Sequence, residues 1–146
     1  MSVRVGIVSF AHVHSPAYAG VLRDLEAADF VGITDEDAAR GAEAAEHFGV
    51  RFFDSAPSLF EEVEAVVVCS ANRNHARDAI PALQGGVHVI CEKPISTTVE
   101  DARAMIQASE DLDSQLRTAF PVRYLPSQGS ARGNSCAREP WDACLP

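Results

Sequence analysis

The sequence predicts an α/β domain built on a doubly wound parallel sheet of about six strands, with helices on both faces. Apolar runs alternate with helical patterns and are joined by short connections, which is typical of parallel strands linked by right-handed crossovers. The runs are apolar throughout, not at every second residue, which indicates strands covered on both faces. With 146 residues, the chain is long enough to bury the core of one domain.

The expected elements follow one another in strict alternation. Each expected strand is a short apolar run, and each expected helix carries its apolar residues at helical spacing. The order is strand 3–8, helix 17–25, strand 30–34, helix 36–48, strand 51–53, helix 58–62, strand 65–69, helix 74–83, strand 87–91, helix 99–111 and strand 115–120. This order fits two βαβαβ halves, so a ligand is expected at the carboxyl ends of the strands, where the strand order reverses.

Residues that begin and end helices stand at the expected boundaries. Ser15 precedes a proline, which fits an N-cap followed by proline in the first turn. Thr98, three residues before an aspartate, resembles the first residue of a capping box. Gly49 and the pair Gly85 and Gly86 stand just past helices, where left-handed caps form.

Composition and charge restrict the partners and the compartment. Asp and Glu outnumber Lys and Arg by 21 to 12, and the net charge of −9 argues against nucleic acid or an anionic membrane as a partner. No apolar run is long enough to span a bilayer, and the chain enters a strand at once, without the features of a signal peptide. The four cysteines lack metal-binding spacing, so we expect reduced thiols in a cytoplasmic protein. Lys93 is the only lysine in the chain, which makes it a candidate for a specific role.

The turn after the first strand is where a dinucleotide-binding fold of the Rossmann type carries its G-x-G-x-x-G fingerprint. Here Ser9, Ala11 and His14 occupy the three glycine places. Serine and alanine are small enough to let the backbone approach a pyrophosphate, and His14 lies before the expected start of the helix. We therefore expect this loop to bind phosphate through Ser9, Phe10, Ala11, His12 and His14.

His12 and His14 also suggest a metal-binding pair. A metal site needs a third ligand, and no histidine, carboxylate or thiolate at a suitable spacing supplies one, so no metal ligands are predicted. A purely structural role for both imidazoles remains open beside phosphate binding.

Asp35 ends the second strand about 20 residues past the turn, where a carboxylate binds the hydroxyls of the adenine ribose. The other role of such an acid, complementing a helix dipole, is the one expected for Glu36 and Asp37. The Asp35 carboxylate would oppose a 2′-phosphate, and its two acidic neighbours add like charge. The sequence therefore predicts NAD in preference to NADP, with Arg40 as the only nearby cation.

From residue 127 the pattern changes. Residues 127–146 have no regular period, and they hold two of the four cysteines and the only tryptophan. We therefore divide the chain into a dinucleotide-binding domain, 1–126, and an irregular tail, 127–146. The tail is either native and disordered or a non-native sequence from a truncated or shifted reading frame. Its Cys and Trp favour the second explanation, because disordered tails are normally richer in charge.

Two further segments carry a resemblance to a known family. The segment 70–75, S-A-N-R-N-H, matches the family pattern T-P-N-x-x-H at Asn72 and His75. The segment 86–94, G-V-H-V-I-C-E-K-P, matches the pattern G-x-H-V-x-x-E-K-P throughout. On these segments and their order along the chain, residues 3–126 resemble the Gfo/Idh/MocA oxidoreductases, which include glucose–fructose oxidoreductase and inositol dehydrogenases.

This resemblance implies hydride transfer between NAD(P) and a sugar, polyol or related alcohol. It implies that Glu92 contacts the nicotinamide ribose and that Lys93 faces the nicotinamide and the substrate, as the catalytic hydrogen-bond donor or proton relay. An ammonium there would stabilise the alkoxide character that develops as hydride leaves. A surface ion pair is the other interpretation of Lys93. The remaining cofactor-binding residues that the resemblance implies are Ser70, Asn72, His75 and Arg123.

Members of this family carry a second, α+β domain that brings further catalytic residues, and none of it is present here. The predicted function is therefore the nicotinamide-dinucleotide-binding domain of an oxidoreductase, incomplete and inactive alone. Self-association through the surface that the missing domain would cover is expected. A non-catalytic nucleotide-binding or regulatory protein is the alternative, and a fold that binds no ligand is a third.

Overall fold

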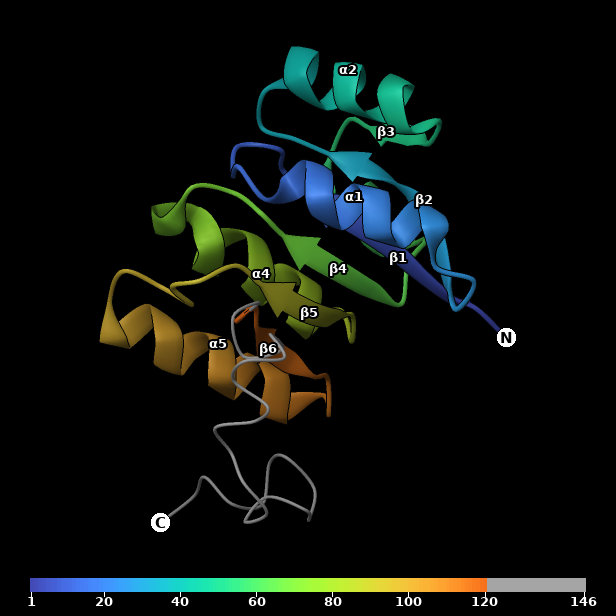
Figure 1. The fold of residues 1–146 in the computed structure, drawn as a ribbon. Helices are drawn as coiled ribbons and strands as arrows, with labels where there is room; N and C mark the ends of the chain where they lie inside the picture. The colour runs from blue at the N-terminus through green and yellow to red at the C-terminus, as the bar shows by residue number, and fades with distance from the viewer. Residues whose placement is uncertain (121–146) are drawn as a thin grey trace, which may run out of the picture.

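The computed structural model describes residues 1–120; Arg123, the boundary expected at residue 126 and the tail 127–146 lie outside the described residues. The described part contains a six-stranded sheet in the order β3-β2-β1-β4-β5-β6, with every pairing parallel (Figure 1). The strands are β1 (Val3–Val8), β2 (Ala28–Thr34), β3 (Arg51–Phe53), β4 (Ala65–Val68), β5 (His88–Cys91) and β6 (Leu116–Thr118).

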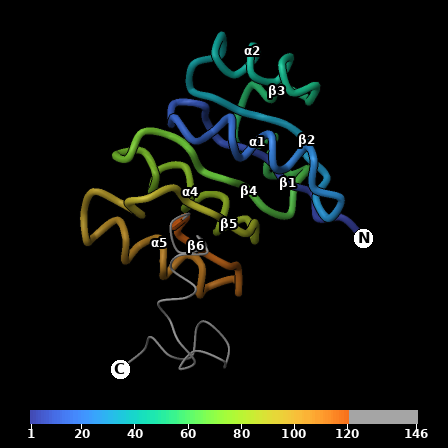
Figure 2. Tube along the Cα trace, in the orientation of Figure 1, coloured from blue at the N-terminus to red at the C-terminus, as the bar shows by residue number. Residues whose placement is uncertain are grey.

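Helices cover the two faces of this sheet in two groups that follow the two halves of the chain. The helices are α1 (Ser15–Asp24), α2 (Ala38–Phe48), α3 (Ala56–Phe60), α4 (His75–Gln84) and α5 (Val99–Asp111), with a short 3-10 turn η1 (Asn72–Asn74) before α4. α1 and α2 pack on one face, and α3, α4 and α5 pack on the other, so the predicted doubly wound α/β fold is confirmed (Figure 2). None of the helices within residues 1–120 has the length and apolar character needed to cross a membrane.

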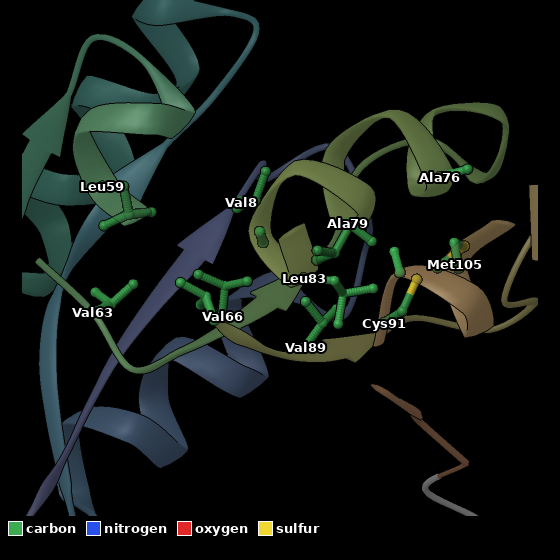
Figure 3. Close-up of a cluster of buried hydrophobic side chains, with 14 of the residues drawn as sticks. Val8, Leu59, Val63, Val66, Ala76, Ala79, Leu83, Val89, Cys91 and Met105 are labelled. Atoms are coloured by element: carbon green, nitrogen blue, oxygen red, sulfur yellow. The ribbon is translucent and has the colours of Figure 1, made fainter. Parts of the chain in front are cut away.

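The central strand β4 shows why its sequence is apolar throughout. Val66 and Val68 face the core beneath α3, α4 and α5, whereas Val67 faces the core beneath α1 and α2. In the first of these cores, Leu83 of α4 and Met105 of α5 are fully buried in the same cluster as the strand residues (Figure 3). Successive side chains of a strand point to opposite faces, so a strand covered on both faces needs apolar residues at every position.

Strand β5 corrects one expectation. Its run was predicted to be buried on both faces, but only Val89 and Cys91 are buried, and His88 and Ile90 are exposed. The reason is that α1 and α2 contact β1, β2 and β3, which leaves one face of β5 without a covering helix among the described elements.

The start of α1 corrects a second expectation. Ser15 is not the N-cap: the helix begins at Ser15, and His14 stands in the N-cap position. The Ser15 hydroxyl instead donates to the carbonyl oxygen of His12 at 2.7 Å. All other boundaries lie within two residues of the predicted ones. The predicted cap of α5 at Thr98 is confirmed, as are the left-handed conformations of Gly49 and Gly86. Gly85 is not left-handed: its φ is −87°.

Candidate functional site

The predicted site residues of the described chain gather at one edge of the sheet. The strand order reverses between β1 and β4, and the carboxyl ends of these two strands border the crevice where this type of fold binds its ligands. The β1–α1 loop follows β1, Asp35 follows β2, Ser70 follows β4 and Glu92 follows β5. Because neighbouring strands are parallel, these segments all leave the sheet on the same side.

The β1–α1 loop, which we expected to bind phosphate, uses most of its amides within the fold. The amide of residue 10 donates to Asp35 Oδ2, and that of residue 11 donates to Ser9 Oγ. The His12 amide donates to the Cys69 carbonyl. The amides of residues 14 and 15 donate to Nδ1 and to the carbonyl oxygen of His12, respectively. Between residues 10 and 15, only the Val13 amide donates to no group of the described chain. The loop therefore offers a ligand one free amide and the side chains of His12 and His14.

Ser9 occupies the first glycine place of the fingerprint. Its φ is +71°, in the left-handed region that favours glycine. The residue is almost fully buried, and its Oγ accepts the Ala11 amide at 3.2 Å. The loop thus keeps the backbone shape that a glycine would give, at a conformational cost of about 1–2 kcal/mol for a residue with a Cβ.

The Asp35 side chain is fully buried and accepts four hydrogen bonds. Arg40 donates through Nε at 2.9 Å and through Nη2 at 2.6 Å, and the amides of Phe10 and Asp37 donate at 2.6 and 2.8 Å. Burial by itself would raise the pKa of Asp35, but these hydrogen bonds outweigh it and hold the pKa below its ordinary value. The Arg40 pair was not predicted, although this arginine had been noted as the nearby cation.

A cleft of about 200 Å³ lies beside Asp35, lined by the ends of β1 and β2, the β3–α3 turn and the first turn of α4. Glu36 closes part of its rim by accepting hydrogen bonds from Arg77 Nη1 at 3.1 Å and Asn74 Nδ2 at 3.2 Å. Glu36 therefore joins β2 to the segment after β4, which differs from the helix-dipole role expected for it. Asp37 lies at the N-terminus of α2, as expected, and is its N-cap, because its side chain accepts the amides of residues 39 and 40.

The three residues expected to bind cofactor after β4 have different surroundings. Ser70 is fully buried, and its Oγ has no hydrogen-bond partner among the described residues. Asn72 is exposed in η1. His75 is fully buried, with Nδ1 2.8 Å from the Pro94 carbonyl and Nε2 3.1 Å from the Ser70 carbonyl. His75 thus links the loop after β4 to the Glu-Lys-Pro segment.

Glu92, which follows β5, is buried at this edge of the sheet. Its side chain is 0% exposed, and Oε1 accepts hydrogen bonds from the Tyr18 hydroxyl at 2.6 Å and from His14 Nδ1 at 2.8 Å. Oε2 accepts the Lys93 amide at 2.8 Å. Burial would raise the pKa of Glu92, but these hydrogen bonds outweigh it and lower the pKa. The role of Tyr18 could not be predicted from the sequence, because an aromatic residue in a helix is usually part of the core.

Lys93 lies at the surface, directly after Glu92 and before a cis peptide bond to Pro94. Within residues 1–120 its ammonium forms no ion pair, so the interpretation as a surface ion pair finds no partner there. Its charge is close enough to His12 to lower the pKa of that imidazole, although burial is the larger cause of the lowering.

His12 and His14 do have a third potential ligand, contrary to the sequence analysis. Glu92 Oε1 lies 2.8 Å from His14 Nδ1 and 3.9 Å from His12 Nδ1. One ligand atom from each of the three residues lies within 4.8 Å of the others. Spacing patterns could not reveal this group, because 78 residues separate His14 from Glu92.

The free polar groups at this edge fit a ligand rich in hydroxyls and phosphates, as the fold implies. Ser70 Oγ is buried without a partner, and buried hydroxyls are normally hydrogen-bonded. The Val13 amide is free beside the N-terminus of α1, where helix dipoles favour anions. A dinucleotide could satisfy both groups, so the residues present fit it.

Comparison with known proteins agrees with this geometry. The family described as "Oxidoreductase family, NAD-binding Rossmann fold" matches residues 3–120. The chain is 32% identical over 127 residues to inositol 2-dehydrogenase 3 of Saccharopolyspora erythraea, an alignment that covers 85% of this chain and 38% of that protein. It is also 32% identical over 128 residues to the UDP-N-acetylglucosamine 3-dehydrogenase of Acidithiobacillus ferrooxidans, covering 86% of this chain and 39% of that protein.

Superposition on solved structures agrees with these sequence matches. That UDP-N-acetylglucosamine 3-dehydrogenase superposes with a TM-score of 0.80 at 30% identity, covering 90% of this chain and 43% of the other. The WlbA dehydrogenase from Bordetella pertussis, in complex with NADH and UDP-GlcNAcA, superposes with a TM-score of 0.82 at 25% identity, covering 89% and 40%. The chain therefore spans about two fifths of the length of the relatives that it matches.

Proposed function

This chain belongs to the Gfo/Idh/MocA oxidoreductase family with its NAD-binding Rossmann fold, and on that premise we propose that it is the dinucleotide-binding part of a dehydrogenase for a sugar, polyol or related alcohol. The names of the relatives, which are dehydrogenases of inositol and of a sugar nucleotide, support this substrate class. The observation that carries the proposal is the meeting of Asp35, Ser70 and Glu92 at the carboxyl edge, where the strand order reverses.

The adenosine half of the dinucleotide would occupy the cleft beside Asp35. In this proposal the Asp35 carboxylate accepts hydrogen bonds from the ribose hydroxyls, in competition with the Arg40 guanidinium that now holds it. A 2′-phosphate in the same place would meet the negative charges of Asp35, Glu36 and Asp37. We therefore propose NAD as the preferred cofactor.

The pyrophosphate and the nicotinamide half would extend across the switch point. The Val13 amide and the imidazoles of His12 and His14 would hold the pyrophosphate at the start of α1. Ser70 Oγ would gain the partner that it lacks, and Glu92 would use its one remaining acceptor site for the nicotinamide ribose. The other residues proposed for this half are Asn72 and Arg123, with His75 positioning the loops around them.

Lys93 is the proposed catalytic residue. The bound dinucleotide would supply the hydride acceptor or donor. As a substrate carbon loses hydride, its hydroxyl oxygen gains negative charge and loses its proton, and the Lys93 ammonium would stabilise that charge. Lys93 is exposed and without an ion pair among residues 1–120, which leaves its ammonium available to a substrate. Because the chain spans two fifths of its relatives, we propose that it does not turn over substrate alone.

Titration calorimetry of the 146-residue chain with NAD⁺ and with NADP⁺, at matched salt, tests the proposal. We expect saturable binding to one site, tighter for NAD⁺. Asp35→Asn should reduce the preference for NAD⁺ by about tenfold, which corresponds to 1.4 kcal/mol, because it removes the charge that opposes a 2′-phosphate. Asp29→Asn, which changes an exposed aspartate of β2, the strand that Asp35 follows, is the matched control. Absence of saturable binding would contradict the proposal, and equal or tighter NADP⁺ binding would contradict the role of Asp35.

A second candidate function is a non-catalytic nucleotide-binding or regulatory protein. The observation that favours it is the β1–α1 loop, whose amides are mostly used within the fold. A chimera of residues 1–120 with the remaining part of inositol 2-dehydrogenase 3 separates the two candidates. Turnover of a polyol panel that Lys93→Ala abolishes, with NAD⁺ affinity retained, supports the dehydrogenase. NAD⁺ binding without turnover in the folded chimera supports the second candidate.

A further inference from the structure

His12, His14 and Glu92 form a cluster whose chemistry exceeds what dinucleotide binding needs. Two imidazoles from one loop converge on a carboxylate from the opposite half of the chain. The His14 Nδ1 to Glu92 Oε1 distance is 2.8 Å, and the His12 Nδ1 to Glu92 Oε1 distance is 3.9 Å. Two ligands of a tetrahedral zinc ion, each bound at about 2.0–2.1 Å, lie about 3.3 Å apart. The two imidazole-to-carboxylate distances lie on either side of this value, and the three ligand atoms lie within 4.8 Å of one another. To bind an ion through Nδ1, His12 would give up the hydrogen bond that it accepts from the His14 amide.

The surroundings of Glu92 prepare it for this role. Tyr18 donates to Oε1 and the Lys93 amide donates to Oε2, so the carboxylate is held in one orientation before any ion arrives. Hydrogen bonds of this kind orient metal ligands in many sites. The His14 side chain is 40% exposed and the His12 side chain 15% exposed, so small rotations can bring both imidazoles to an ion that enters from solvent.

We propose that His12, His14 and Glu92 bind a divalent transition-metal ion of the zinc class through two imidazole nitrogens and one carboxylate oxygen, with one coordination position left open. This set of ligands is typical of zinc sites with three protein ligands. Two imidazole nitrogens favour an ion of the zinc class over Mg²⁺ and Ca²⁺, which prefer oxygen ligands. The ion would join the β1–α1 loop to the end of β5, and this inference does not depend on the proposed dehydrogenase function.

Titration of the chelator-treated 146-residue chain with ZnCl₂ tests the site. We expect one zinc ion per chain with micromolar affinity and a higher melting temperature, since an ion that binds only the folded state stabilises it. His12→Ala and His14→Ala should each weaken zinc binding at least tenfold, whereas His47→Ala, which removes an exposed histidine of α2, should not change it. Circular dichroism shows whether each variant is folded, and His14→Gln replaces any alanine variant at that position that is not.

Cysteine is the competing zinc ligand in this chain. A Cys136→Ser, Cys144→Ser double variant should bind zinc as the parent chain does. Co²⁺ bound to the parent chain should give visible absorption bands without the strong near-ultraviolet band of a cobalt–thiolate bond. Zinc affinity lost with the two cysteines, a thiolate band, or binding unchanged in both histidine variants would overturn the proposal, as would the absence of stoichiometric binding.

The NAD⁺ titration is run on the chelator-treated chain before zinc is added, because both proposals use His12, His14 and Glu92. Zinc binding without NAD⁺ binding would contradict the proposed function alone. NAD⁺ binding without zinc binding would contradict the metal site alone.

Discussion

At the scale of single residues, Asp35 joins three parts of the molecule through one buried carboxylate. Its hydrogen bonds reach the β1–α1 loop at Phe10, the start of α2 at Asp37 and the next turn at Arg40. An ionised carboxylate has about four acceptor sites, and all four are used here. In the proposed site a ribose would have to displace Arg40 from at least one oxygen, so this ion pair would lower the affinity for the ribose.

The lowered pKa of Asp35 makes the free energy of unfolding depend on pH. The pKa of Asp35 is lower in the folded chain than its ordinary value, so the ionised carboxylate stabilises the fold. This stabilisation is complete above the ordinary range near pH 4 and is lost as the pH falls through that range and then through the folded pKa. Asp35→Asn should lower the free energy of unfolding at neutral pH by about 1–3 kcal/mol, and the difference from the parent should shrink in acid.

Urea unfolding at neutral pH and near pH 3 measures this difference. Asp29→Asn serves as the control, because it removes an exposed carboxylate from β2, the strand that Asp35 follows. A difference between Asp35→Asn and the parent that stays constant from neutral pH into acid would show that the hydrogen bonds of Asp35 do not depend on its charge.

Ser9 allows a test of backbone strain in the β1–α1 loop. Ser9→Gly removes the Cβ that is unfavourable at a φ of +71°, but it also removes the hydrogen bond from the Ala11 amide to Oγ. Ser9→Ala removes the same hydrogen bond and keeps the Cβ. Chemical denaturation should therefore find Ser9→Gly more stable than Ser9→Ala by about 1–2 kcal/mol. Equal stability of the two variants would mean that the left-handed conformation of this residue is not maintained in solution.

At the scale of elements, α1 and α2 each contain a glycine, and the two have opposite surroundings. A Cβ added to Gly20 of α1 would meet no atom within 4 Å, whereas one added to Gly41 of α2 would lie 2.5 Å from the Phe52 ring and 2.7 Å from Asp35 Cβ. The close approach of α2 to β2 and β3 therefore depends on Gly41.

Alanine substitutions at these two positions should change stability in opposite directions. Gly20→Ala should raise the free energy of unfolding by about 0.5–1 kcal/mol, because alanine loses less backbone freedom in a helix. Gly41→Ala should lower it by about 1–3 kcal/mol, because the gain in helix propensity is smaller than the cost of overpacking. Thermal and urea unfolding of both variants checks the signs. A stabilising Gly41→Ala would mean that α2 can move away from the sheet without loss.

The order of the strands and helices could be predicted from the sequence, but the contacts between them could not. Continuous apolar runs such as Val66 to Val68 identify buried strands, because the cause of burial lies within the run itself. The burial of β5 depends instead on which helices reach it, and Ile90 is exposed because none of those described does. In the same way Tyr18 and Glu92, 74 residues apart, meet only because β1 and β5 end at the same edge. Local pattern carries no information about that meeting.

At the scale of the whole molecule, the sheet is covered unevenly. On the face where α1 and α2 lie, these helices contact β1, β2 and β3. The exposed side chains of β5 on the uncovered face include Ile90, which is 42% exposed. An exposed apolar side chain on an uncovered strand is available for contact with another protein surface. The chain spans about two fifths of the relatives that it matches. In a purified sample of this chain, the protein surface available for such a contact is that of a second copy.

We therefore expect the purified chain to self-associate reversibly through the uncovered face of β5. Sedimentation velocity over a range of concentrations should show a monomer at low concentration and a larger species at high concentration. Ile90→Asp should weaken this association at least about tenfold, because it removes apolar area worth about 1.5–3 kcal/mol when buried and adds a charge to the contact. Val21→Asp, which changes a 61% exposed valine on α1, should leave the association unchanged. A chain that stays monomeric at all concentrations, or an association that responds to Val21→Asp and not to Ile90→Asp, would show that the uncovered face of β5 is not the contact.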